Sequence, residues 1–368
     1  SDIHIQPEED NVRVRYRIDG TLHDQLSLPL SAGVPLISRL KILAKMNIAD
    51  RQRPQDGQIT VKPKDRAEMD IRVATIPILW GEMAALRVQN KSTSNLPLPQ
   101  LGFLPESLAI YQEMLKVPYG MILCTGPTGS GKTTTLYASL NTLDRKGRNI
   151  ITIEDPVEGH FKNINQIQVN VKAGLTFASG LRSILRLDPN VLLVGEMRDA
   201  ETAGIAIQAS LTGHLVLSTI HANDSIGVVA RLIDLGVEPF LVASALIGVV
   251  AQRMGRRVCR DCAKMVEAPP LEQAAYTKET GEVRKEFLYG SGCKTCSNTG
   301  YKGRIGYYEI LRISDVFRTM LLKGANANEL RVQALKEGMI PLIKDGMLKV
   351  KAGITTPADV LRNAYSAD

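Results

Sequence analysis

The sequence predicts an α/β protein in which a small α+β domain precedes a larger α/β domain that carries a four-cysteine insertion and a helical C-terminal region. Apolar strand-like runs alternate with helical patterns between residues 101 and 256, which indicates a buried, largely parallel sheet. Within this region Gly126–Thr133 reads GPTGSGKT between a predicted strand and a predicted helix. Two CxxC pairs follow it.

The composition is that of an ordinary globular protein of two or three domains. The chain has 368 residues, of which 44% are hydrophobic and 23% charged, so a disordered or fibrous chain is excluded. The longest apolar run, near Phe240–Ala251, is shorter than the roughly 20 residues that a membrane-spanning helix needs. Because no signal-peptide pattern opens the chain, we expect a cytoplasmic location.

Residues 1–90 are expected to form the small α+β domain. Polar and apolar residues alternate over Asn11–Ile18 and lead to the turn pair Asp19-Gly20, which is typical of a hairpin strand. Apolar residues at helical spacing predict a helix over Leu36–Ile48. Further strands are expected at Met69–Val73 and Ala84–Val88.

Four further segments complete the predicted organisation. Residues 91–100 are polar, contain two prolines and are interpreted as a linker. Residues 101–256 are expected to form the α/β core, 257–300 a cysteine-bearing subdomain and 301–368 the helical C-terminal region. The predicted core strands are Met121–Thr125, Ile150–Ile153, Val191–Val194 and His214–Ile220.

The loop Gly126–Thr133 is the strongest functional signal. Its glycines let backbone N–H groups wrap phosphate oxygens, and a helix predicted over Thr133–Leu143 adds positive potential at its N-terminus. We expect Lys132 to reach the β- and γ-phosphates and the Thr133 hydroxyl to bind Mg²⁺. The alternative is a glycine-rich turn that matches by chance. The predicted nucleotide-binding residues are Gly126, Pro127, Thr128, Gly129, Ser130, Gly131, Lys132, Thr133 and Thr134.

Two sets of carboxylates follow predicted strands. Val191–Val194 leads to Glu196, which we expect to polarise a water molecule or to hold the Mg²⁺ coordination shell. A surface glutamate after a core strand is the alternative. Glu154, Asp155 and Glu158 follow another strand and could orient metal or water, or could be plain loop acids.

Two histidines bracket the predicted strand His214–Ile220. A separation of seven residues would put His214 and His221 on opposite faces of a regular strand, which argues against a shared metal site. His214 is interpreted as a hydrogen-bonded structural residue. His221, close to Asn223 and Asp224, is the better candidate for sensing phosphate.

Four of the five cysteines form two CxxC pairs separated by 30 residues. Four thiolates from two such turns match a closed, tetrahedral and structural Zn²⁺ site. A redox pair or two disulfides are the alternatives. The predicted zinc ligands are Cys259, Cys262, Cys293 and Cys296.

Together these blocks resemble the secretion ATPases that power bacterial type IV pilus assembly and type II secretion, over essentially the whole chain. Ser1–Ile5 is similar to the opening of that family's second N-terminal, PAS-like domain. The other matching blocks are Gly126–Thr134 (Walker A), Ile151–Glu158 (aspartate box), Leu181–Asp199 (Walker B), Thr212–Asp224 (histidine box) and the cysteine quartet (zinc region).

The resemblance implies a RecA-like core, Mg²⁺-dependent ATP hydrolysis and a ring of six subunits. It also implies that Arg72 and Arg87 approach the phosphates, where fixed guanidinium charge suits the charge that develops on the γ-phosphate. From the residues alone, either arginine would pass as a strand-surface side chain. The implied catalytic residues are Glu196, Lys132, Arg72, Arg87, His221 and Glu158, with Thr133 and Glu196 at the Mg²⁺ ion.

The chain departs from the family pattern in three blocks and at its start. Asp188-Pro189-Asn190 replaces Asp-Pro-Asp, Gln55–Gln58 replaces Gln-Asp-Gly-Arg, and Gly81–Met83 replaces Gly-Glu-Asp or Gly-Glu-Arg. Because Lys132 and Glu196 are retained, we expect activity to survive. The chain starts inside the family pattern, so we expect it to lack the family's first N-terminal domain.

The expected function is that of a homohexameric ATPase motor, cytoplasmic and peripheral to the inner membrane, that drives type IV pilus assembly. Its expected partners are an inner-membrane platform protein and a cytoplasmic adaptor, through which it associates with the membrane. A type II secretion motor is the close alternative. A nucleic-acid-translocating ATPase and a regulatory module without turnover are alternatives of other classes. One Trp, ten Tyr and six Phe are few for stacking on bases, so no nucleic-acid partner is expected.

The formal charge of +7 lies mostly in the last third of the chain, where 19 basic and 13 acidic residues follow residue 255. Four zinc-bound thiolates would lower this total by about two charges. We expect the remaining surplus to face an acidic platform protein or the inner leaflet. A solvated surface with a mild surplus is the alternative.

Overall fold

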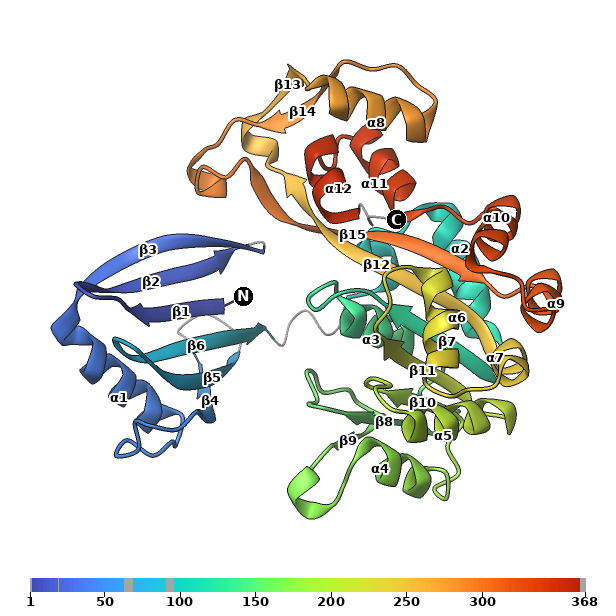
Figure 1. The fold of residues 1–368 in the computed structure, drawn as a ribbon, viewed down its shortest axis with the longest axis horizontal. Coiled ribbons are helices and arrows are strands. Elements are labelled where there is room, and N and C mark those ends of the chain that lie inside the picture. Colours follow the sequence, from blue (N-terminus) through green and yellow to red (C-terminus); the bar gives the residue numbers. More distant parts are fainter. Residues whose placement is uncertain (1, 19, 63–68, 91–95, 365–368) are drawn as a thin grey trace. The chain divides into compact units, whose positions relative to one another are not determined.

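The computed structural model describes residues 2–18, 20–62, 69–90 and 96–364, and it divides into two compact units, Ser1–Thr93 and Ser94–Asp368 (Figure 1). Each unit has its own hydrophobic core. Of the predicted features, Ser1, Asp19 and residues 91–95 of the linker lie outside the described residues. The rest of the linker belongs to the second unit, where the short 3-10 helix η3 (Leu98–Leu101) buries both of its leucines.

The first unit is a six-stranded antiparallel sheet of order β3-β2-β1-β6-β5-β4 with helix α1 packed on one face. The alternation predicted over Asn11–Ile18 is confirmed, because Val12 and Val14 are buried beneath the helix. The elements are β1 (Asp2–Pro7), β2 (Asn11–Ile18), β3 (Thr21–Pro29), α1 (Gly33–Leu43), β4 (Gln55–Val61), β5 (Met69–Ile78) and β6 (Gly81–Asn90).

Helix α1 is shifted toward the N-terminus relative to the predicted Leu36–Ile48. It includes Pro35, which the first turn tolerates because the N–H groups there have no partner within the helix. It ends at Leu43 because Lys45 takes a positive φ of 57°, which a right-handed helix cannot continue. Ile48, counted as part of the apolar stripe, is 47% exposed in the loop that follows.

The second unit is built on a seven-stranded sheet of order β15-β12-β7-β11-β10-β8-β9 (Figure 1). The β12–β15 pair is antiparallel and the other neighbouring pairs are parallel, so the largely parallel buried sheet is confirmed. The four predicted strands are found to within one residue. The strands are β7 (Gly120–Thr125), β8 (Ile150–Glu154), β9 (Asn165–Gln168), β10 (Val191–Val194), β11 (Leu215–Ile220), β12 (Leu246–Val258) and β15 (Tyr301–Arg312).

Helices cover both faces of this sheet. Met121 and Leu123 of β7 face a core formed with α4 to α7, α9 and α10, while Ile122 and Cys124 face a core formed with η3, α2 and α3. The helices are α2 (Pro105–Lys116), α3 (Lys132–Thr142), α4 (Phe177–Ile184), α5 (Ala200–Leu211), α6 (Ser225–Asp234), α7 (Pro239–Ala245), α9 (Asp315–Leu322) and α10 (Ala327–Lys336). The short 3-10 helix η4 (Val171–Ala173) precedes α4.

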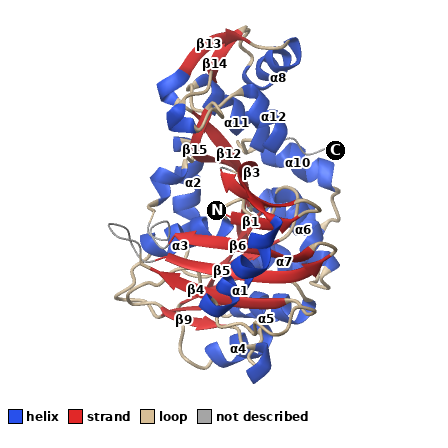
Figure 2. Cartoon of the chain, turned by 90° about the vertical axis from the view of Figure 1, so that its left-hand side faces the viewer, coloured by secondary structure: helices blue, strands red, loops and turns tan. Residues whose placement is uncertain are grey.

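The cysteine-bearing insertion connects β12 to β15. It contains the antiparallel pair β13 (Ala263–Glu267) and β14 (Glu286–Gly290), helix α8 (Pro270–Thr280) and two single-turn 3-10 helices. Helices α11 (Leu342–Lys351) and α12 (Pro357–Ala364) pack on β12 and β15 and on α8 (Figure 2). No helix in the described part of the chain is both long enough and apolar enough to span a membrane.

The segment from residue 301 onward, expected to be helical, begins instead with strand β15. Gly303 and Gly306 disfavour a helix, and pairing with β12 satisfies the strand's backbone groups. Tyr307 and Tyr308 point to opposite faces of the sheet and are buried in different cores. Helices follow only from Asp315.

Candidate functional site

The loop between β7 and α3 is shaped by three glycines with positive φ: Gly126 (146°), Gly129 (80°) and Gly131 (89°). A Cβ atom on Gly126 would lie 2.3 Å from the backbone oxygen of Gln252, so no larger residue fits there without displacing a strand. Gly131 caps α3, which leaves the N–H groups of the first helical turn facing the loop. The arrangement is a backbone cradle for a phosphate-like anion.

Lys132 lies over this cradle. Its Nζ donates hydrogen bonds to the carbonyl oxygens of Gly126 (2.7 Å) and Pro127 (3.1 Å). Burial lowers the pKa of Lys132 below its usual value; the Arg253 guanidinium acts in the same direction, and the Glu196 carboxylate acts against it. The Lys132 ammonium group is therefore within electrostatic range of one acidic side chain from the loop after β10 and one basic side chain from β12.

The floor of the cradle holds unused hydrogen-bonding capacity. Ser130 Oγ and Gln252 Oε1 are buried and have no partner within the described part of the chain, although Gln252 Nε2 donates to the Ser130 carbonyl oxygen at 2.5 Å. Buried polar atoms are normally paired, so these two fit a site that binds a polar ligand. Pro127–Gly129 form an exposed rim, and Thr133 and Thr134 are half-buried.

Glu196 follows β10 and lies beside the loop that follows β11. Its side chain is 15% exposed; Arg198 Nη2 is 2.5 Å from Glu196 Oε1, and His221 Nε2 is 3.8 Å from Oε2. The structure thus brings Glu196 and His221 together, and Lys132 lies within electrostatic range of the same carboxylate. His214 lies at the opposite end of β11, with its Nδ1 2.9 Å from the Ala209 carbonyl oxygen.

Glu154, predicted as a candidate ligand of metal or water, is engaged in hydrogen bonds within the fold. Its carboxylate is buried and accepts hydrogen bonds from the Tyr137 hydroxyl, from Thr152 Oγ1 (2.6 Å) and from Gln166 Nε2 (3.2 Å). Burial raises the pKa of Tyr137 well above its usual value, and Glu154 adds to this shift. Glu154 therefore ties α3 to β8 and β9.

The other two acids of this box have different environments. Asp155 and Glu158 are exposed, and the Glu158 N–H donates to the Tyr137 hydroxyl oxygen at 3.1 Å. Asp155 contributes to raising the pKa of Arg198, whose main cause is the hydrogen bond to Glu196. Asp155 therefore acts electrostatically on Arg198, the partner of Glu196.

Arg72 and Arg87 form a directly opposed pair on neighbouring strands β5 and β6 of the first unit. Arg87 Nε lies 3.2 Å from Asp2 Oδ1, and the Arg87 side chain is 63% exposed. The phosphate loop belongs to the second unit. The approach of these arginines to phosphate stays a prediction.

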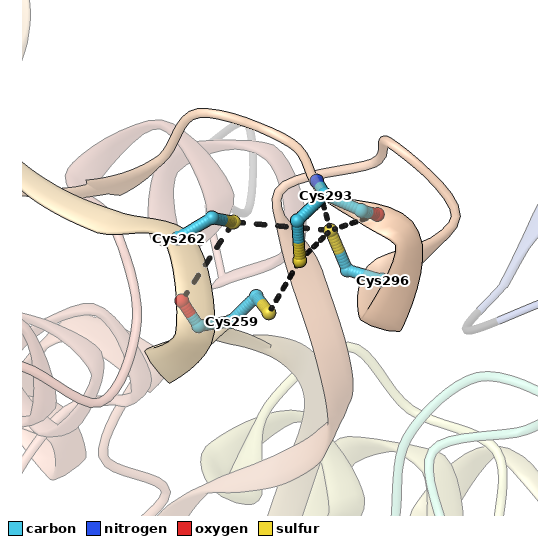
Figure 3. Close-up of side chains that lie close together, drawn as sticks. All are labelled: Cys259, Cys262, Cys293 and Cys296. Atoms are coloured by element: carbon cyan, nitrogen blue, oxygen red, sulfur yellow. Dashed lines mark hydrogen bonds between the residues drawn. The ribbon is translucent and has the colours of Figure 1, made fainter.

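The four paired cysteines converge at the junction of β12, β14 and β15 (Figure 3). Their sulfur atoms lie within 4.8 Å of one another, and all four thiols are free. The Sγ–Sγ distances are 3.8 Å for Cys259–Cys293, 3.9 Å for Cys262–Cys296 and 3.7 Å for Cys293–Cys296. Four sulfurs about 2.3 Å from one tetrahedral ion lie about 3.8 Å apart, so this cluster fits a metal site.

The thiols also differ in their surroundings. Burial acts to raise the pKa of Cys296, but N–H groups of Cys293 and Gly300 donate to its Sγ and bring the pKa down to about 6. Burial raises the pKa of Cys262 to about 12. N–H donation to a metal-binding sulfur favours the thiolate that a metal requires.

A phosphate-binding loop at the carboxyl end of the central parallel strand β7, with an acidic residue after β10, two strands along the sheet, defines a P-loop protein of the α/β class. More narrowly, the chain belongs to the type II/IV secretion system protein family, whose sequence model matches residues 1–362. The family resemblance inferred from the motif blocks is thereby confirmed.

Relatives from both branches of this family are about equally similar. The chain is 43% identical over 375 residues to the type IV pilus assembly ATPase PilB of Myxococcus xanthus, covering 99% of this chain and 64% of that protein. It is 45% identical over 362 residues to the type II secretion system protein HxcR of Pseudomonas aeruginosa, covering 98% and 73%. The crystal structure of the pilus retraction motor PilT with bound ADP matches with a TM-score of 0.64 at 25% identity, covering 100% and 93%.

Several residues at the site were not predicted from the sequence. Gln252 and Arg253 lie on β12, Arg198 follows Glu196, and Thr125 ends β7. Apart from the Arg198–Glu196 pair, their contacts join positions far apart in the chain; the bond from Gln252 to Ser130 spans 122 residues. The sequence feature that could have indicated Gln252 and Arg253 is their position directly after the apolar run that ends at Ala251.

Proposed function

We propose that this chain is the nucleotide-hydrolysing part of a secretion or pilus motor, with Mg²⁺-dependent ATP hydrolysis as its reaction. The observation that supports it most is the meeting of three groups at one sheet edge: Lys132 after β7, His221 after β11 and Glu196 after β10. These strands are neighbours in the sheet. Ligands of open α/β sheets bind at this edge.

In this proposal the backbone of Gly126–Gly131 holds the phosphates and Lys132 binds the β- and γ-phosphates. The Thr133 hydroxyl and the Glu196 carboxylate would hold Mg²⁺, which neutralises charge on the phosphates when bound. Glu196 orients the attacking water and accepts its proton. His221, 3.8 Å from Glu196, orients that carboxylate.

Two arginines of the first unit complete the proposed site. Arg72 and Arg87 would bring fixed positive charge to the γ-phosphate, where it stabilises the charge that develops during transfer. Loss of the γ-phosphate would weaken these contacts and let the two units separate, which is how hydrolysis would produce movement.

We further propose that Zn²⁺ occupies the four-cysteine cluster. Four sulfur ligands leave no open coordination position, so the ion would be structural. It would join the insertion to the end of β12, where the Cys259 N–H donates to the Gly300 carbonyl oxygen at 2.9 Å.

The machine that we propose is the type IV pilus assembly system, with a type II secretion system as the alternative. The chain spans 64% of the first relative's length, so hexamer formation, cytoplasmic location and binding to a platform protein and an adaptor belong to the proposal. Because the identities to PilB and HxcR are similar, they support a motor function common to both systems more than they support pilus assembly or type II secretion in particular.

Phosphate release from ATP by the purified chain tests the proposed reaction. We expect release that needs Mg²⁺, is lost in Lys132→Ala and is unaffected by added DNA or RNA. Absence of any Lys132-dependent release would contradict the proposal. A many-fold stimulation by nucleic acid with steep salt dependence would favour a nucleic-acid motor instead.

A further inference from the structure

We infer that Arg331 of helix α10 is a positioning residue for the catalytic centre, acting through the loop His221–Asp224. The inference rests on the proposed function, because it assigns a role in the hydrolysis carried out at Glu196. Arg331 lies 107 residues from its partner Asp224 in sequence. It lies outside the phosphate loop and outside the blocks that predicted the site.

Arg331 forms an ion pair with Asp224, and that carboxylate serves two elements at once. Asp224 Oδ2 accepts from Arg331 Nη2, while Asp224 Oδ1 accepts from the Gly227 N–H at 2.7 Å and so caps helix α6. The side chains are 35% and 17% exposed, respectively. One carboxylate therefore connects the end of the loop, the start of α6 and the middle of α10.

The rest of the loop is held from other directions. Thr125 Oγ1, at the end of β7, donates to the Ala222 carbonyl oxygen and accepts from the Ala222 N–H, both at 2.9 Å. Arg253 Nη2 donates to the Asn223 carbonyl oxygen at 2.5 Å. Through Thr125 the loop is joined directly to the strand that carries the phosphate loop.

Helix α6 is fixed at its first residue by strand β15. The Ser225 N–H and hydroxyl both donate to the buried Glu309 carboxylate, at 2.9 and 2.5 Å. Residues 222 to 225 are therefore all anchored, and the ion pair at Asp224 is one of the contacts that set the position of the loop that begins at His221. His221 is the loop residue whose side chain meets Glu196.

The pair between Arg331 and Asp224 could also serve only to hold α10 on α6. That task is already performed by apolar contacts, since Leu330 and Ala334 of α10 are buried in the core that α6 shares. Partly exposed ion pairs add little to stability. The pair is therefore better suited to setting the geometry of the loop than to stabilising the helix.

Steady-state ATP hydrolysis by Arg331→Gln, Arg331→Lys and Asp224→Asn tests this inference. We expect Arg331→Gln to lower kcat about tenfold with an unchanged KM for ATP, since the phosphate loop is untouched. Arg331→Lys, which keeps the charge, should recover part of the loss. Asp224→Asn keeps an oxygen for the α6 cap, so it should reproduce the effect of Arg331→Gln without unfolding the helix.

Lys336→Gln is the matched control, because it removes the same charge from the exposed end of α10 and Lys336 makes no ion pair among the described residues. Its kcat should equal that of the unmodified chain. The thermal unfolding temperature and the mass of the particle in solution should be the same for Arg331→Gln as for the unmodified chain. If that variant fails to fold, Asp224→Asn and Arg331→Lys decide the question by the same kcat criterion.

The double variant Arg331→Gln/His221→Ala distinguishes an effect that Arg331 exerts through His221 from an effect on kcat that is independent of His221. If Arg331 acts through His221, Arg331→Gln should cause no further loss of kcat in the His221→Ala background. The same fold-loss in both backgrounds, or an unchanged kcat in Arg331→Gln and Asp224→Asn, would overturn the inference while leaving the proposed function intact. Lack of Lys132-dependent hydrolysis in the unmodified chain would instead refute the proposed function.

Discussion

At Gly126 the absence of a side chain decides whether the phosphate loop can take its shape. The residue has a φ of 146°, and a Cβ atom there would lie 2.3 Å from a backbone oxygen of β12. Gly129 also has a positive φ, yet a Cβ atom there would meet nothing within 4 Å. Both glycines need a positive φ, but only at Gly126 would a side chain clash with neighbouring atoms. A comparison of the two positions therefore separates the clash from the backbone strain.

Gly126→Ala should weaken ATP binding by at least about tenfold, or about 1.4 kcal/mol, because the clash adds to the strain of the positive φ. Gly129→Ala should carry only the strain, about 1–2 kcal/mol of folding stability, and retain ATP affinity within a few-fold. Fluorescent-nucleotide titration and thermal unfolding measure both effects. Equal losses of affinity in the two variants would contradict the role given to the close contact with Gln252.

Residue-level prediction from the sequence is possible where the residues of a site are close together in the chain. The glycines, Lys132 and Thr133 lie within one strand–loop–helix unit, so spacing is enough to identify them. Glu154 shows the limit: its place after a strand suggested a metal or water ligand, but Tyr137 and Gln166 approach it from α3 and β9 and occupy its oxygens. Its hydrogen-bond partners depend on tertiary packing, which a strand-end position does not reveal.

At the scale of elements, the pairing of β12 with β15 could not be inferred from local pattern. The two strands are separated by the whole cysteine insertion, and their pairing is a long-range contact. Buried charge is a second example. Lys349 of α11 is buried, pairs with Asp345 and donates to the Gly306 carbonyl oxygen at 2.6 Å, and a lysine within a helical pattern does not reveal such contacts.

The cysteine insertion gives the prediction that belongs to this scale. Elemental analysis should find one zinc per chain in the unmodified protein, because four free thiols lie at tetrahedral spacing. Cys262→Ser should lose zinc and expose amide protons in β13 and β14 to exchange. ATP binding should persist, because the phosphate loop follows β7, which lies on the other side of β12 from β15.

Cys124→Ala is the control for this experiment. Cys124 is a buried thiol of β7 outside the quartet, so its removal should leave one zinc per chain. Substoichiometric zinc in metal-replete unmodified protein, or a disulfide within the quartet, would contradict the assignment.

At the scale of the whole molecule, the chain consists of two units with separate cores, and the candidate catalytic groups are divided between them. Lys132, Glu196 and His221 belong to the second unit, and the Arg72–Arg87 pair belongs to the first. This division was expected only from the family resemblance, because nothing in a strand-surface arginine of one domain indicates a phosphate bound by another.

The proposal depends most on Glu196 as the residue that orients and deprotonates water. Replacement by Gln keeps the shape of the side chain but removes the base, so general-base catalysis worth about 10²–10⁴-fold is lost. Glu201→Gln is the matched control and should retain full turnover, because Glu201 is an exposed glutamate of α5 that pairs with Arg182 of α4.

Phosphate release and ATP affinity measured on the same Glu196→Gln preparation therefore give the most direct test. We predict a fall in the rate of phosphate release of at least about 100-fold, with the Kd for ATP within a few-fold of that of the unmodified chain. Retained turnover in Glu196→Gln, with Glu201→Gln unaffected, would contradict the assignment of Glu196 and with it the proposed mechanism.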